Sequence, residues 1–149
     1  MNDLSPAEYR ALADFRYEIR RFLHFSEGQA RAYGLEPQQH QLLLAIRGIP
    51  KGTDATVGEL AARLRLKHHS TVELVNRLET LGAVARSKNE EDRRKVIVKL
   101  TAPGSALLRK LSLAHRHELE ATAPALIRSL RAVMRAGNAV KSTRRHAVD

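Results

Sequence analysis

Residues 56–82 read TVGELAARLRLKHHSTVELVNRLETLG, and this stretch carries the strongest signal for the fold. Thr56 precedes a glutamate by three residues, the spacing of a capping box, which predicts a short helix that runs to Leu64. After a turn of about four residues, a second helix is predicted over residues 68–81, with Gly82 as its C-cap. The apolar positions of this second helix that are expected to point inward are Val72, Val75, Leu78 and Leu81. Two short helices joined by a tight turn form a helix-turn-helix.

A β-hairpin is expected directly after these two helices. Residues 83–87 and 96–100 have strand character, and between them lies the polar run KNEEDRRK at residues 88–95. Two strands joined by such a run predict a hairpin with a charged tip. A hairpin in this position is the wing of a winged helix-turn-helix.

Two helices are expected before this core. Ser5 and Glu8 have the spacing of a capping box, and the apolar stripe that follows predicts a long helix to about Tyr33. A second helix, opened by a proline, is predicted over residues 37–47. Glycines and a proline within residues 48–52 then break the chain into a loop.

Two more helices are expected after the hairpin. The first begins at Pro103, and the second runs from Pro124 to about Ala136, because proline favours the first position of a helix. Residues 138–149 are polar and basic, and we expect this tail to be disordered. The predicted class is therefore mainly α with a small β-hairpin wing, in one domain over residues 1–149.

The composition narrows the range of partners. The 149 residues carry a formal net charge of +10, and residues 63–110 hold twelve basic residues against five acidic ones, which favours a polyanion. Single-strand binders stack bases on aromatic side chains, but every aromatic residue of this chain lies before that basic segment, which favours duplex DNA. The aromatic residues are Tyr9, Phe15, Tyr17, Phe22, Phe25 and Tyr33.

Several classes of protein are excluded or disfavoured. With no cysteine, the chain has no disulfide framework and no thiolate metal site. No apolar run reaches the length of a membrane span, and no secretory signal is present, so a cytoplasmic protein is expected.

There is no phosphate-binding glycine loop and no nucleophile elbow, so we expect neither catalysis nor a cofactor. Adjacent His68 and His69 point about 100° apart on a helix, so no metal site is expected there.

The order of these elements, together with three sequence motifs, resembles the MarR family of bacterial transcriptional regulators. The resemblance covers residues 8–137 and is carried by VGELA at residues 57–61, HSTVELVNRLE at residues 69–79 and DRR at residues 92–94 with VKLT at residues 98–101. It implies a homodimer whose first and last helices, residues 5–34 and 103–137, interlock. It also implies that residues 37–101 form the DNA-binding part, with half-sites about 34 Å apart on a palindrome.

The resemblance places the second helix of the motif in the major groove and the wing in the minor groove. The helix residues expected to contact DNA, because the first turns of such a helix face bases and phosphates, are Lys67, His68, His69, Ser70, Thr71 and Arg77. In the wing, Arg94 matches the arginine that enters the minor groove, and Asp92 matches the acid that braces it. Arg93 and Lys95 are expected to add phosphate contacts. Glu73 either accepts a hydrogen bond from cytosine or, as we favour, pairs with Arg77.

The family also suggests a pocket for a small aromatic or anionic effector. The residues that match its expected place are Phe15, Arg20, Phe22 and His40. The competing interpretation, which we favour, is that these aromatic residues are interface core. His115 lies on an apolar stripe, which is more typical of a hydrogen-bonded interface histidine than of a zinc ligand.

The sequence thus predicts a regulator, most simply a repressor, that binds a palindromic operator as a homodimer and is released by a small ligand. The alternative is an architectural winged-helix protein that binds DNA without sequence preference or ligand control. Large discrimination between DNA sequences would support the regulator, and salt-dependent but sequence-blind binding would support the alternative.

Overall fold

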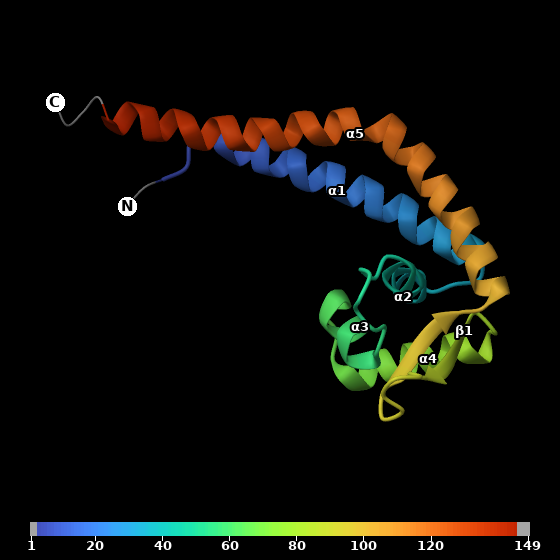
Figure 1. Cartoon of the computed structure of the whole chain (residues 1–149). Coiled ribbons are helices and arrows are strands. Elements are labelled where there is room, and N and C mark those ends of the chain that lie inside the picture. The colour runs from blue at the N-terminus through green and yellow to red at the C-terminus, as the bar shows by residue number, and fades with distance from the viewer. Residues whose placement is uncertain (1–2, 146–149) are drawn as a thin grey trace. The chain divides into compact units, whose positions relative to one another are not determined.

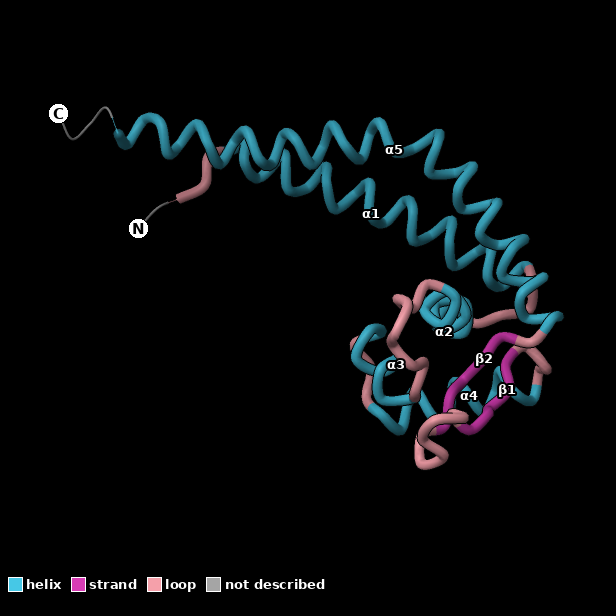
Figure 2. Tube along the Cα trace, viewed as in Figure 1, coloured by secondary structure: helices cyan, strands magenta, loops and turns pink. Residues whose placement is uncertain are grey.

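The computed structural model describes residues 3–145 and, within them, has helices and one antiparallel β-hairpin (Figure 2). The elements in chain order are α1 (Pro6–Ala32), α2 (Pro37–Arg47), α3 (Val57–Leu64), α4 (His68–Thr80), β1 (Val84–Lys88), β2 (Val96–Leu100) and α5 (Ala102–Arg145). The hairpin register pairs Val84 with Leu100 and Lys88 with Val96. The predicted fold class, mainly α with a β-hairpin wing, is confirmed.

The chain divides into two compact units, whose elements can be followed in Figure 1. One unit comprises residues 27–114, and the other comprises residues up to 26 together with those from 115 onward. These limits differ from the boundaries expected from the sequence, because the end of α1 and the start of α5 belong to the unit with the helix-turn-helix. Ala30, Leu108 and Leu111 are buried in its core, which accounts for the shift.

The core of the 27–114 unit is built from α2, α3, α4 and the hairpin. Leu42 and Leu43 from α2 meet Leu60 from α3 and Val75 and Leu78 from α4, and all five side chains are fully buried. The hairpin closes this core through the buried residues Val84 and Val98. The backbone N–H of Val98 also donates to the carbonyl oxygen of Ala55, at 2.9 Å, so β2 is tied to the segment before α3.

Local capping signals place the helix starts as expected. The backbone N–H of Ser5 donates to Glu8 Oε2 at 2.7 Å, and that of Glu8 donates to Ser5 Oγ at 3.3 Å, which forms the predicted capping box. Thr56 Oγ1 accepts a hydrogen bond from the backbone N–H of Glu59 at 3.2 Å. Helix α4 ends at Thr80, and Gly82, with φ of +74°, lies one residue beyond its C-cap.

The buried face of α4 differs from the predicted one. The residues that the helix buries are Thr71, Leu74, Val75 and Leu78, whereas Val72 is half-buried and the Leu81 side chain is 57% exposed. Thr71 can occupy the core because its Oγ1 donates to the carbonyl oxygen of Lys67 at 3.1 Å. Burying a hydroxyl is tolerated when a hydrogen bond satisfies it. The prediction is therefore confirmed for Val75 and Leu78 and wrong for Leu81.

Helix α5 corrects two further predictions. It is one continuous helix that contains Pro124, whereas the sequence suggested two helices, and it extends to Arg145 rather than ending near Ala136. A proline inside a helix costs about 3 kcal/mol, but strong helix formers flank it on both sides in the run ATAPALIRSLRA at residues 121–132. The predicted disordered tail is therefore wrong for residues 138–145, and residues 146–149 lie outside the described residues.

In the other unit, contacts between residues 22–26 of α1 and His115 of α5 place the two helices side by side, as they are drawn in Figure 1. The imidazole of His115 contacts the rings of Phe22 and Phe25 edge-on, and its Nε2 lies 2.7 Å from the buried Ser26 Oγ. Many large apolar side chains of this unit are nevertheless exposed, among them Tyr17, Leu23, Ile127, Leu130 and Met134. None of the described helices has a segment long and apolar enough to cross a membrane.

Candidate nucleic-acid interface

The first turn of α4 is a polar, exposed surface. Lys67 occupies the N-cap position, and its side chain and those of His68 and His69 are exposed, while Ser70 is half-buried. Arg65, at the C-cap of α3, adopts the left-handed conformation, with φ of 53°, and so makes the tight turn between the two helices. Free backbone N–H groups at a helix N-terminus attract phosphate, and basic side chains add to that attraction.

Thr71 does not belong to this surface. Its side chain is fully buried, and its hydroxyl is already committed to the Lys67 carbonyl oxygen. The prediction that Thr71 contacts DNA is therefore wrong, because the residue lies on the core side of α4.

Replacing Thr71 by valine tests this correction. Since valine keeps the buried volume and removes only a hydroxyl that faces Lys67, Thr71→Val should change the affinity for DNA by less than about twofold. His69→Ala, which truncates an exposed side chain in the same turn, should weaken binding more. Equilibrium titration of a fluorescent duplex measures the DNA affinity of both variants. Equal losses of affinity would mean that Thr71 contacts DNA after all.

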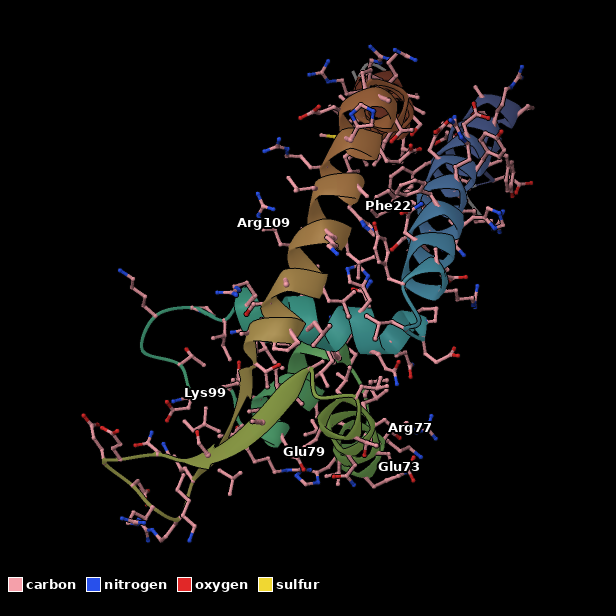
Figure 3. The ribbon with its side chains drawn as sticks, turned by 90° about the vertical axis from the view of Figure 1, so that its right-hand side faces the viewer. Phe22, Glu73, Arg77, Glu79, Lys99 and Arg109 are labelled. Atoms are coloured by element: carbon pink, nitrogen blue, oxygen red, sulfur yellow. The ribbon has the colours of Figure 1, made fainter. Side chains whose placement is uncertain are left out.

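Beyond the first turn, α4 carries exposed charged residues. Figure 3 shows Glu73 and Arg77 on this helix, and within the described residues they form no ion pair with each other, contrary to our expectation. Two residues after Arg77, Glu79 Oε1 accepts a hydrogen bond from Arg86 Nη1 at 3.0 Å. Arg77 is therefore available to a ligand, whereas Glu79 is engaged by the hairpin.

Arg86 joins β1 to α4, and sequence reasoning missed this role. Besides Glu79, its guanidinium donates through Nη2 to Asn76 Oδ1 at 2.7 Å. Asn76 is thereby turned toward the hairpin. No local pattern identifies Arg86, because the contact depends on how the strand lies against the helix, ten residues away in the chain.

The wing tip presents an arginine whose orientation is fixed. Arg94 donates to Asp92 Oδ1 through its backbone N–H and its Nε, both at 3.1 Å, and to Oδ2 through Nη2 at 3.3 Å. The Arg94 side chain is nonetheless 92% exposed. The guanidinium is thus held at one end and open to solvent at the other.

The same contacts keep Asp92 ionised. The hydrogen bond from the Arg94 side chain, then that from its backbone N–H, lowers the pKa of Asp92 below the usual 3.8. A lowered pKa in the folded state means that the contact is present at neutral pH and is lost only as the pH falls below that value. Asp92 is therefore ionised, and can accept the hydrogen bonds from Arg94, across the physiological pH range.

The two neighbours of Arg94 differ from each other. Arg93 is exposed, whereas Lys95 Nζ lies 3.6 Å from Asp54 Oδ2, in the segment before α3. Neither Asp54 nor its partner Asn89 was identified from the sequence. Asn89 could have been found, because an asparagine at the start of a polar turn favours a side-chain bond to the backbone two residues ahead.

The residues of the predicted effector pocket fall into different units. Phe15, Arg20 and Phe22 belong to the unit with the N-terminal part of α1, and His40 is buried in α2 of the 27–114 unit. The pocket accordingly stays a prediction. Among the residues that the structure describes, no group of three acidic, histidine or cysteine side chains is arranged to hold a metal ion.

Comparison with known proteins agrees with this architecture. Residues 33–95, which include every predicted DNA contact, match a family model described as MarR family. Over 102 residues the chain is 38% identical to YcgE, an uncharacterized HTH-type transcriptional regulator of Bacillus subtilis (strain 168). That match spans 68% of this chain and 64% of the relative, which is less than two thirds of its length.

Two solved structures are similar in fold. AbsC, a MarR family transcriptional regulator from Streptomyces coelicolor, superimposes with a TM-score of 0.71 at 20% identity, over 98% of this chain and 99% of AbsC. A mutant MarR from E. coli, solved in complex with operator DNA, superimposes with a TM-score of 0.58 at 23% identity, over 70% of this chain and 73% of that one. At these identities the likeness establishes the fold.

Proposed function

Because this chain belongs to the MarR family, we propose that it is a sequence-specific transcriptional regulator, not an enzyme, that binds duplex DNA. The proposal extends to a repressor in the cytoplasm that binds a palindromic operator as a homodimer and is released by a small aromatic or anionic effector. MarR-family regulators are DNA-binding proteins, and one of the structural neighbours was solved with operator DNA.

One observation carries the proposal. Within the 27–114 unit, the basic first turn of α4 and the braced, solvent-exposed Arg94 of the wing belong to the same compact body. A helix presenting Lys67, His68 and His69 suits the major groove, which is wide enough for a helix. An exposed arginine at a hairpin tip suits the narrow minor groove, where the negative potential is strongest.

The homodimer is supported by apolar surface that a single chain leaves uncovered. On α5, Ile127, Leu130 and Met134 are exposed and recur every three to four residues, so they share one face of the helix. On α1, Tyr17 and Leu23 are also exposed. A second copy that covers these side chains would remove their apolar surface from water.

A charge on this face of α5 is expected to break the dimer. Leu130→Glu should shift the protein from dimer to monomer in sedimentation equilibrium, because dimerisation would have to bury the carboxylate. Arg128→Glu is the matched control. Arg128 is exposed but lies outside this stripe, about 100° around the helix from Ile127. If Leu130→Glu remains as dimeric as the control, this face is not the interface.

Selection from a random duplex pool tests the proposed function. At fixed salt, the wild-type protein should enrich a palindrome with half-sites about one helical turn, or ~34 Å, apart. Competitor DNA measures the discrimination between the selected site and other sequences. Tight binding with no enriched sequence would replace the regulator by a sequence-blind architectural protein, and no binding at all would overturn both.

A further inference from the structure

A continuous set of hydrogen bonds leads from the segment before α3 to the wing tip. Asp54 Oδ2 accepts from Asn89 Nδ2 at 3.0 Å, across a sequence separation of 35 residues. Asn89 Oδ1 in turn accepts from the backbone N–H groups of Glu91, at 2.8 Å, and Asp92, at 3.2 Å. The carboxylate of Asp92 then holds Arg94 by its backbone and its guanidinium. We call these residues, Asp54, Asn89, Asp92 and Arg94, the wing relay.

Asp54 itself is fixed to the body of the unit and to the far side of the hairpin. The carbonyl oxygen of its neighbour Ala55 accepts a hydrogen bond from Val98 N–H at 2.9 Å, and both Ala55 and Val98 are buried. Asp54 Oδ2 also lies 3.6 Å from Lys95 Nζ. The carboxylate therefore contacts the hairpin on both sides of its tip, through Asn89 before the turn and Lys95 after it.

We propose that Asp54 is a positioning residue for DNA binding, which acts through Asn89 and Asp92 to fix the direction in which Arg94 leaves the wing. The inference rests on the proposed function. It also assigns Lys95, expected from the sequence to bind phosphate, to holding the wing through Asp54. Arg94 remains the group that enters the groove.

Electrostatics by itself gives the opposite expectation for Asp54. A carboxylate on the DNA-binding unit repels phosphate, and it pairs with a lysine that could otherwise attract phosphate. If charge were its only effect, removing Asp54 would strengthen DNA binding. If Asp54 positions the wing, removing it weakens binding, because Arg94 must then be ordered at the moment of association. The sign of the change separates the two roles.

The test compares variants of the full-length protein on the selected operator at fixed salt. Asp54→Ala should bind about fivefold more weakly, whereas Asp54→Asn, which keeps an acceptor for Asn89 Nδ2, should stay within about twofold. Glu90→Ala is the matched control, because Glu90 is an exposed acid of the same hairpin outside the relay. It removes the same charge and should bind as tightly as wild type or more tightly.

A double-mutant cycle with Arg94 reports whether Asp54 acts through that residue. In the wild-type background the loss from Arg94→Ala should be several-fold larger than in the Asp54→Ala background, because the relay no longer orients the guanidinium there. Independent effects that simply multiply would overturn the proposal. So would an Asp54→Ala variant that binds as tightly as Glu90→Ala.

A measurement without DNA keeps the relay testable even if the proposed function fails. The backbone N–H groups of Glu91 and Asp92 are bonded to Asn89 Oδ1, so their hydrogen exchange should accelerate in Asp54→Ala and not in Glu90→Ala. Unchanged exchange at both amides would overturn the relay itself. Wild-type protein that binds no duplex, with exchange accelerated as expected, would overturn the proposed function and leave the relay standing.

Discussion

Arg94→Ala is expected to weaken binding to the selected operator by about 30-fold. A loss of this order is typical when one well-placed arginine is removed from a groove. The Arg94 side chain is 92% exposed and Arg94 donates three hydrogen bonds to Asp92, so its guanidinium is already oriented in the free protein. Little rotamer freedom is then lost on binding, and most of the interaction with the groove appears as affinity. Equilibrium titration of the operator at fixed salt measures the loss.

Arg93→Ala is the matched control for this prediction. Arg93 is the adjacent arginine and is also exposed, but among the described contacts its side chain forms no hydrogen bond or ion pair with Asp92. We expect Arg93→Ala to weaken binding by only a few-fold on every DNA sequence. The slope of log affinity against log salt concentration should fall by the amount that about one phosphate contact contributes. Arg94→Ala should also reduce the preference for A·T-rich DNA beneath the wing. Equal losses for the two arginines, with no change in preference, would assign Arg94 to phosphate contact alone.

Gly104→Ala is expected to destabilise the fold by about 3 kcal/mol. Gly104 is buried in the first turn of α5, where a Cβ would overlap the carbonyl oxygen of Ala83 and lie 2.7 Å from its carbonyl carbon. The obstacle is backbone, which cannot turn away as a flexible side chain can. Thr101 N–H donates to this same carbonyl oxygen at 3.1 Å, so relief of the overlap would also disturb the junction between α4, the hairpin and α5.

Thermal unfolding followed by circular dichroism, at one protein concentration, measures this effect. A loss of that size should lower Tm by about 10 °C for a chain of this length. Gly137→Ala is the matched control, because Gly137 lies in the same helix and its added Cβ meets no described atom within 4 Å beyond its chain neighbours and the helix's own backbone. Alanine there should leave Tm unchanged or raise it slightly, since it is the better helix former. A Gly104→Ala protein that melts within about 2 °C of wild type would mean that the junction adapts.

The elements with local signals could be predicted from the sequence. A proline or a capping residue begins a helix through groups only a few residues away, so the starts of α1 at Pro6, α2 at Pro37 and α3 after Thr56 could be predicted. The limits of β2 followed from residue composition and from the polar run before it. The contact between Asp92 and Arg94, which the family resemblance implied, also joins residues only two apart.

Which side chains those elements bury, and which they expose, depends on the packing of the whole unit and could be predicted only in part. The sequence predicted Leu81 on the buried face of α4, but packing buries Thr71 and leaves Leu81 exposed. Helix α5 continues through Pro124, which was expected to divide it, because strong helix formers lie on both sides of this residue. Arg86 reaches α4, and Asp54 reaches the wing, across separations that no periodicity encodes. Helix capping depends on a few neighbouring atoms, so it could be predicted from the sequence. Burial and long-range hydrogen bonds depend on the whole packed unit, so they had to be observed in the structure.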